Sequence, residues 1–213
     1  MPRIRVHQHV NPLAPYFRFA PKPLDLDAVF AHPKSPLHLD IGAVRGRFLL
    51  QMSELFPARN FLGIEIREPL VAEANRLKNE KNLTNLRYEF VNATLALDKF
   101  LENLPAEILQ TVTIQFPDPW YKKKHSKRRM VNKEMVETIA RRLAISGKVF
   151  IQTDVEFLAA EMFEMFRKNK NFKEISIAKN PFPAKTEREK AVEEKLLPVY
   201  RRLFEKVFRA DKD

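Results

Sequence analysis

The sequence predicts a single α/β domain built on a mostly parallel sheet with helices on both faces. Apolar runs of strand length alternate with longer stretches of helical periodicity, which is the pattern of repeated β-α-β units. The length of 213 residues fits one such domain, and 45% hydrophobic residues are enough for a substantial core. We find no internal repeat or low-complexity tract that would argue for another architecture.

Six strands are expected from the apolar runs. They are 37–41, 61–66, 86–91, 111–116, 148–153 and 172–178. Five helices are expected between them, at 45–56, 69–79, 96–104, 133–144 and 155–169. Residues 186–196 have a helical pattern, whereas 199–208 fit either a helix or a late strand.

Residues 1–34 are expected to form an N-terminal arm that precedes the folded domain at 35–213. Seven of the fifteen prolines fall within residues 1–36, together with several arginines and aromatic residues. Proline lacks a backbone donor and fixes φ, so this segment suits neither a helix nor a central strand. The arm is therefore expected to be either loose or draped over the domain.

The composition limits both the chemistry and the partners of the chain. Lys and Arg number 38 against 27 Asp and Glu, and this net charge of +11 favours a polyanion as partner, with solubility alone as the alternative. The absence of cysteine excludes disulfides and thiolate catalysis, and five scattered histidines do not indicate a metal centre. No apolar run approaches the roughly 18 residues of a membrane span, and the first residues lack a signal-peptide core. We expect a cytoplasmic protein without a membrane partner.

The segment 116–129 carries the most specific signal. Prolines bracket Asp118 directly after a buried strand, so Asp118 and Trp120 must project from a stiff loop. Six of the eight residues 122–129 are Lys or Arg. A carboxylate and an aromatic side chain held beside such a run indicate chemistry on a nucleic acid. The structural alternative is a turn-capping aspartate beside a solvated loop.

Polar residues also stand at the ends of successive strands. In chain order they are Asp40, Glu65, Asn92, Asp118 and Asp154. Ligands of open α/β sheets bind outside the carboxyl ends of the strands. A carboxylate after the second strand can accept hydrogen bonds from both hydroxyls of a ribose, and Asp40 can accept one from an ammonium group. An acidic pocket of this kind favours a cationic nucleoside, for which S-adenosylmethionine is the obvious candidate.

Glycine is scarce in this chain, so the positions of Gly42 and Gly46 are informative. They bracket the turn between the first strand and the first helix, where glycine permits close approach of a ligand to the backbone. The spacing matches neither the dinucleotide-binding motif nor a Walker A loop, which disfavours a pyrophosphate site. An ordinary strand-to-helix turn is the alternative.

These segments resemble tRNA (guanine-N7)-methyltransferases of the bacterial single-subunit type. The resemblance spans about residues 37–203 and is carried by 40–42, 63–67, 116–129 and 153–154. It implies a Rossmann-like methyltransferase fold, S-adenosylmethionine as methyl donor, and N7 of a guanine in the variable loop of tRNA as acceptor. No metal is expected.

The resemblance also implies the roles of individual residues. Those expected to line the donor pocket are Asp40, Gly42, Glu65, Asn92 and Asp118, of which Asp118 is the expected catalytic residue. Those expected to face the tRNA are Lys122, Asp154, Thr186, Glu187, Arg188 and Glu189. Lys127, Arg128 and Arg129 are expected to contact the RNA backbone. Val44 stands where the family has a third glycine, which narrows the backbone freedom of the turn.

The implied reaction depends on alignment more than on proton transfer. Guanine N7 carries an in-plane lone pair and no proton, so holding N7 in line with the methyl group would supply most of the catalysis. Asp118 would accept hydrogen bonds from the N1–H and N2 amino edge of the guanine and stabilise the charge that develops on the ring. Trp120 either stacks on a base or fills the core.

Other functions remain open from the sequence. The chain could be a methyltransferase that acts on another RNA base or on a protein, or a non-enzymatic RNA-binding protein. The acidic strand ends argue against the last of these, since a phosphate binder gains nothing from an acidic pocket. Both a monomer and a homodimer are compatible with the sequence.

Overall fold

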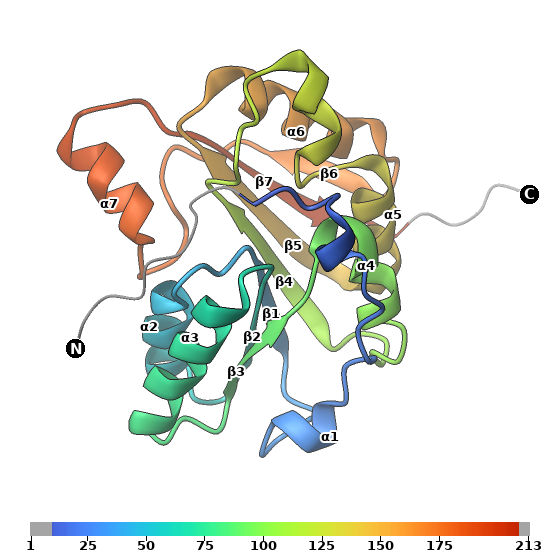
Figure 1. Ribbon diagram of the computed structural model, residues 1–213, viewed down its shortest axis with the longest axis vertical. Helices are drawn as coiled ribbons and strands as arrows, with labels where there is room; N and C mark the ends of the chain where they lie inside the picture. Colours follow the sequence, from blue (N-terminus) through green and yellow to red (C-terminus); the bar gives the residue numbers. More distant parts are fainter. Residues whose placement is uncertain (1–9, 209–213) are drawn as a thin grey trace, which may run out of the picture.

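The computed structural model describes residues 10–208 and contains a central sheet between two layers of helices (Figure 1). Within this range the sheet has seven strands in the order β3-β2-β1-β4-β5-β7-β6. The parallel strands are β1 (Leu37–Ile41), β2 (Asn60–Glu65), β3 (Leu86–Phe90), β4 (Leu109–Gln115) and β5 (Leu143–Thr153). β7 (Tyr200–Lys206) runs antiparallel between β5 and β6 (Phe172–Ile175). The predicted mostly parallel sheet is confirmed.

Helices cover both faces of this sheet, as predicted (Figure 1). One face carries α2 (Arg47–Leu55) and α3 (Glu68–Glu80), and the other carries α4 (Ala93–Phe100), α5 (Lys133–Arg142) and α6 (Glu156–Lys168). α4 begins earlier than expected, because the side chain of Asn92 caps it by accepting from the backbone N–H of Thr94 (3.2 Å). Among residues 10–208, no helix is long and apolar enough to cross a membrane.

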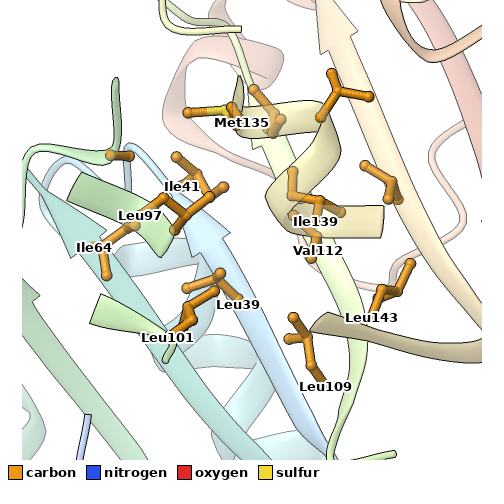
Figure 2. Close-up of a cluster of buried hydrophobic side chains, with 14 of the residues drawn as sticks. Leu39, Ile41, Ile64, Leu97, Leu101, Leu109, Val112, Met135, Ile139 and Leu143 are labelled. Atoms are coloured by element: carbon orange, nitrogen blue, oxygen red, sulfur yellow. The ribbon is translucent and has the colours of Figure 1, made fainter. Parts of the chain in front are cut away.

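The larger hydrophobic core lies between the sheet and α4, α5 and α6. Alternate residues of β1, Leu39 and Ile41, point to this face, and Figure 2 shows them beside Leu97 of α4. The same view shows Val112 of β4 beneath Ile139 of α5. Because β1 and β4 are covered along this face, their carboxyl ends are held in a fixed position at one edge of the sheet.

The ambiguous tail forms α7 (Glu187–Glu194) followed by strand β7. β7 pairs with β5 from Lys148 opposite Glu205 to Thr153 opposite Tyr200. Its Phe204 is fully buried in the larger core. The strand alternative for residues 199–208 is therefore the correct one, and it places the start of β7 beside the carboxyl end of β5.

The described part of the N-terminal arm is draped over the domain. Leu24, Leu26 and Phe30 are buried in the larger core. A 3-10 turn, η1 (Pro15–Phe17), and a one-turn helix, α1 (Leu26–Val29), form within it. The expectation that this segment holds no helix is thus wrong for α1, which lies between the prolines and is capped by the carboxylate of Asp25. Residues 1–9 lie outside the described residues, and the boundary between 34 and 35 stays a prediction.

Candidate active site

A cavity of about 520 Å³ lies at the carboxyl ends of the parallel strands. The strand order reverses between β1 and β4, which is the position where open α/β sheets bind their ligands. The cavity wall includes Gly42 after β1, Glu65 of β2, Gln115 of β4 and Asp118 after β4. Its volume lies within the range typical of small-molecule sites.

Strained backbone gathers around this cavity. Val44, Phe116 and Trp120 have left-handed φ values of 51°, 50° and 44°, and all line the cavity. Such conformations are costly for residues with a Cβ and persist only where the surroundings hold them, most often at functional sites. Gly42 has a φ of 85° and also lines the cavity, so its missing side chain leaves the backbone open to a ligand.

Asp40 lies behind the cavity wall, near the end of β1. Its Oδ1 accepts from the hydroxyl of Thr113 (2.6 Å) and from the amide of Gln115 (3.4 Å). Because that hydroxyl gives its only proton to Asp40, it accepts from Nε2–H of His38 (3.0 Å). Burial raises the pKa of Asp40 to about 6 and lowers the pKa of His38 to about 3. At neutral pH the imidazole is therefore uncharged, and Asp40 carries a buried negative charge.

Glu65 ends β2 and presents a fixed carboxylate to the cavity. Its oxygens accept from the backbone N–H groups of Val44 and Arg67, each at 3.0 Å. The guanidinium of Arg67 adds bonds from Nε (2.8 Å) and Nη2 (3.1 Å). Burial opposes the charge of Arg67, but the hydrogen bonds and charge of Glu65 and the charge of Asp118 outweigh it and raise the pKa of Arg67. Arg67 thus interacts with both carboxylates. A ribose that binds Glu65 must therefore share this carboxylate with Arg67 or displace the Arg67 guanidinium from it.

Asn92 follows β3 and connects the arm to the cavity. It is buried, and it also lines the cavity. Its Nδ2 donates to the backbone carbonyls of Pro12 (2.8 Å) and Phe17 (3.1 Å). Val10 and Pro12 line the same cavity. The polar atoms of Asn92 are therefore engaged by the arm and by the start of α4, and the arm forms part of the site.

Arg129 holds the loop that carries Asp118 through hydrogen bonds to the loop backbone. The guanidinium of Arg129 donates to the carbonyls of Pro119 (3.1 Å) and Trp120 (3.3 Å), and it forms an ion pair with Glu161 of α6. Its side chain is only 12% exposed. These internal contacts engage the Arg129 guanidinium, and we infer that, contrary to the expectation, it does not contact the RNA backbone. Arg129 instead positions the loop of Asp118.

Two lysines of the basic segment are more exposed than Arg129. Lys122, which directly precedes a 3-10 turn, η2 (Lys123–Arg128), and Lys127, which lies within it, are both exposed. Arg128 lines the cavity and lies with its guanidinium 5.0 Å over the ring of Trp120. Trp120 is half-buried, so it is not a plug within the core.

Helix α7 covers the end of β5. Arg188 forms an ion pair with Asp154, and both line the cavity. Glu187 forms an ion pair with Arg47 of α2, which links α7 to the helix after the glycine turn. Thr186 caps the helix, since its hydroxyl accepts from the backbone N–H at position 189 (3.0 Å).

Glu189 is fully buried and cannot touch a tRNA without rearrangement, so the expectation of direct contact is corrected. Its carboxylate accepts from Gln152 (2.9 Å), Asn180 (2.8 Å) and Arg201 (3.1 Å). Gln152 also donates to Gln115 (2.9 Å), which in turn donates to Asp40. A buried polar chain therefore runs from α7 to the cavity.

The two glutamines of this polar chain were not among the site residues expected from the sequence. A signal was available, because Gln115 and Gln152 interrupt apolar runs that read as buried strands. The structure pairs them directly across β4 and β5. Arg67 and Tyr121, which both line the cavity, were also missed. Within residues 10–208, no group of three or more His, Cys, Asp or Glu side chains is arranged to hold a metal ion.

Known proteins resemble this chain over nearly its whole length. A family model described as a putative methyltransferase matches residues 34–202. The tRNA (guanine-N(7)-)-methyltransferase of Trichormus variabilis is 50% identical over 211 residues, which cover 97% of this chain and 98% of that one. The protein of the same name from Synechococcus elongatus is 51% identical over 207 residues, with 96% and 97% covered. The similarity thus extends into the arm, beyond the 37–203 range expected from the sequence.

Solved structures share the fold at low identity. An rRNA methylase from Streptococcus thermophilus has a TM-score of 0.53 and 13% identity, with 86% of this chain and 92% of that one covered. A putative methyltransferase from Streptococcus mutans in complex with SAH has a TM-score of 0.53 and 10% identity, with 85% and 93% covered. The expected Rossmann-like methyltransferase fold is confirmed. The relatives' identity over nearly their full length shows that the chain belongs to the tRNA (guanine-N7)-methyltransferase family.

Proposed function

We propose that this protein transfers a methyl group from S-adenosylmethionine to N7 of a guanine in the variable loop of tRNA. Relatives with this activity in their names align over nearly the whole chain. The observation that carries the proposal is the position of Asp118, which lies between two prolines on the wall of the cavity that Gly42 and Glu65 also line. A run of cations follows within the same loop.

The ends of β1 and β2 suit this methyl donor. The open backbone at Gly42 permits close approach, and Glu65 presents carboxylate oxygens of the kind that accept from a ribose diol. The buried charge of Asp40 complements ammonium and sulfonium groups. When bound, the donor supplies an electrophilic methyl group.

The protein contributes alignment and charge to the transfer. Guanine N7 needs no general base, because its lone pair lies in the ring plane and carries no proton. Asp118 accepts hydrogen bonds from the N1–H and N2 amino group, which orients the base and stabilises the positive charge that methylation places on the ring. Arg67 interacts with both Glu65 and Asp118, so it would connect the donor side of the cavity to the base side.

The cations beside the cavity support tRNA as the substrate. Lys122 and Lys127 are exposed, and Arg128 is half-buried on the cavity wall, so all three can neutralise phosphates. We infer that Asp154 and Arg188, joined by an ion pair on the cavity wall, face the same substrate. A tRNA substrate also implies a cytoplasmic protein.

Nucleoside analysis tests this proposal. Purified protein is incubated with methyl-labelled S-adenosylmethionine and total tRNA, which is then digested and separated by mass spectrometry. We expect labelled 7-methylguanosine, and little of it from Asp118→Ala. A different labelled nucleoside would identify another RNA base as the acceptor. Label in added protein alone would indicate a protein methyltransferase, and tRNA binding without any transfer would indicate a non-enzymatic RNA-binding protein.

A further inference from the structure

The loop after β4 leaves one large aromatic side chain in solvent. Tyr121 is 71% exposed, although it lines the cavity. An exposed ring gives up the stabilisation that burial would provide. The preceding Trp120 is engaged, since the Arg128 guanidinium lies 5.0 Å over its ring and the ring of His125 lies 5.7 Å away, edge to face. Tyr121 is therefore the residue of this loop that presents an accessible aromatic surface.

A second ring holds Tyr121 in place. Phe157, in the first turn of α6, is 40% exposed, and its centroid lies 5.8 Å from that of Tyr121 at an interplanar angle of 61°. The guanidinium of Arg129 lies 5.0 Å over the ring of Phe157 and also donates to the carbonyl of Pro119 in the loop. One guanidinium thus fixes both the loop and the ring against which Tyr121 rests. The aromatic pair (Tyr121 and Phe157) is a preformed surface.

The charges around the aromatic pair identify the partner that it suits. Lys122, Lys123 and Lys124 follow Tyr121 directly and are exposed. Arg188 lines the same cavity. A partner with flat aromatic groups on a polyanionic backbone matches both features, and single-stranded nucleic acid is such a partner. Stacking of this kind tolerates any base, because every base has a π-face.

We propose that the aromatic pair stacks an unpaired tRNA nucleobase that neighbours the target guanine. This inference rests on the proposed function. A guanine within tRNA tertiary structure must leave its stack to reach the cavity, and its neighbour then loses a stacking partner. Tyr121 lies on the cavity wall and replaces that partner, which lowers the cost of extruding the guanine.

The test uses three substitutions of one residue and one matched control. Tyr121→Ala removes the ring, Tyr121→Leu keeps apolar bulk without a π-face, and Tyr121→Phe keeps the ring. Phe208→Ala removes another exposed aromatic (74% exposed), which follows the end of β7 at the opposite edge of the sheet. The probe is a tRNA with 2-aminopurine on either side of the target guanine. Its fluorescence, the Kd and KM for tRNA, and the donor Kd are measured for each protein.

We expect Tyr121→Ala to raise the Kd for tRNA by roughly ten-fold or more and to abolish quenching at one of the two neighbouring positions. Tyr121→Leu should behave like Tyr121→Ala, and both Tyr121→Phe and Phe208→Ala should behave like the unaltered protein. An unchanged donor Kd shows that each variant is folded with an intact cavity.

Wild-type tRNA affinity and quenching in Tyr121→Ala would overturn the inference, even if the unaltered protein forms 7-methylguanosine as proposed. Full retention of both in Tyr121→Leu would also overturn it, because plain apolar contact would then suffice. A change of oligomeric state in Tyr121→Ala with unchanged tRNA affinity would assign the aromatic pair to a protein interface instead. Absence of any methyl transfer by the unaltered protein would remove the proposed function, and this inference with it.

Discussion

Replacing Asp40 by asparagine should make the donor-free protein more stable. The carboxylate is buried, and burial raises its pKa from 3.8 to about 6. Its two hydrogen bonds, from Thr113 and Gln115, both go to Oδ1. An asparagine side chain keeps an oxygen at that position, so Asp40→Asn removes the buried charge while both bonds can persist.

The magnitude follows from the pKa shift. A rise from 3.8 to about 6 is roughly two pKa units, and each unit corresponds to about 1.4 kcal/mol, so ionised Asp40 costs the folded state about 3 kcal/mol. Below pH 3.8 the carboxyl is protonated in both states, and the substitution should change little. Between pH 3.8 and about 6 the unfolded chain ionises first, so the wild type loses stability relative to Asp40→Asn. Above pH 6 the full difference remains.

The assay is urea unfolding of both proteins without donor, at pH values from 4 to 8. At pH 8 we expect a gain of about 3 kcal/mol for Asp40→Asn, or a melting temperature higher by roughly 6–12 °C. The same variant should bind S-adenosylmethionine more weakly by calorimetry, because the charge that destabilises the empty site complements the cationic donor. Equal stability at pH 8, or a difference that does not vary with pH, would refute the reasoning.

Four further variants test separate parts of the site. Asp118→Ala should lower kcat about a hundred-fold or more while the Kd for tRNA stays within a few-fold, and near-normal single-turnover rates would remove the carboxylate from the mechanism. Glu65→Ala should raise the Kd for S-adenosylmethionine roughly ten- to a hundred-fold, since charged-acceptor contacts to the ribose are lost, and an unchanged calorimetric Kd would show that it does not touch the ribose. Changing Lys127 and Arg128 together to alanine should flatten the dependence of log tRNA affinity on log salt by roughly one to two units. Arg129→Ala should instead lower kcat with little change in that slope, because Arg129 holds the loop carbonyls, and equal slopes for both variants would contradict this distinction.

Much of the fold could be predicted because its signals are local. The strands are short apolar runs and the helices have regular periodicity, so their order and the sheet class follow from the sequence. β7 could not be assigned in this way. It is hydrogen-bonded on both sides, to β5 and β6, and only that tertiary pairing decides between strand and helix for its residues.

The candidate site was predictable where residue type and strand position coincide. Glu65 and Asp118 follow apolar runs and line the cavity, as their positions indicated. Arg129 was expected to face the RNA because it ends a run of cations, and Glu189 because of the family resemblance. Both are turned inward by partners distant in the sequence, Glu161 for the first and Gln152 for the second. Such pairings depend on tertiary packing, so they cannot be predicted from the local sequence pattern.

A tRNA in which the target guanine is replaced by 7-deazaguanine tests the central claim most directly. This analogue exchanges N7 for a C–H group and keeps the N1–H and N2 amino edge that Asp118 is proposed to bind. The account predicts that the protein binds the substituted tRNA with nearly unchanged affinity and transfers no methyl group to it, while the unsubstituted tRNA gains one methyl group. Equal methylation of both tRNAs would contradict the account, because the acceptor would then be another atom.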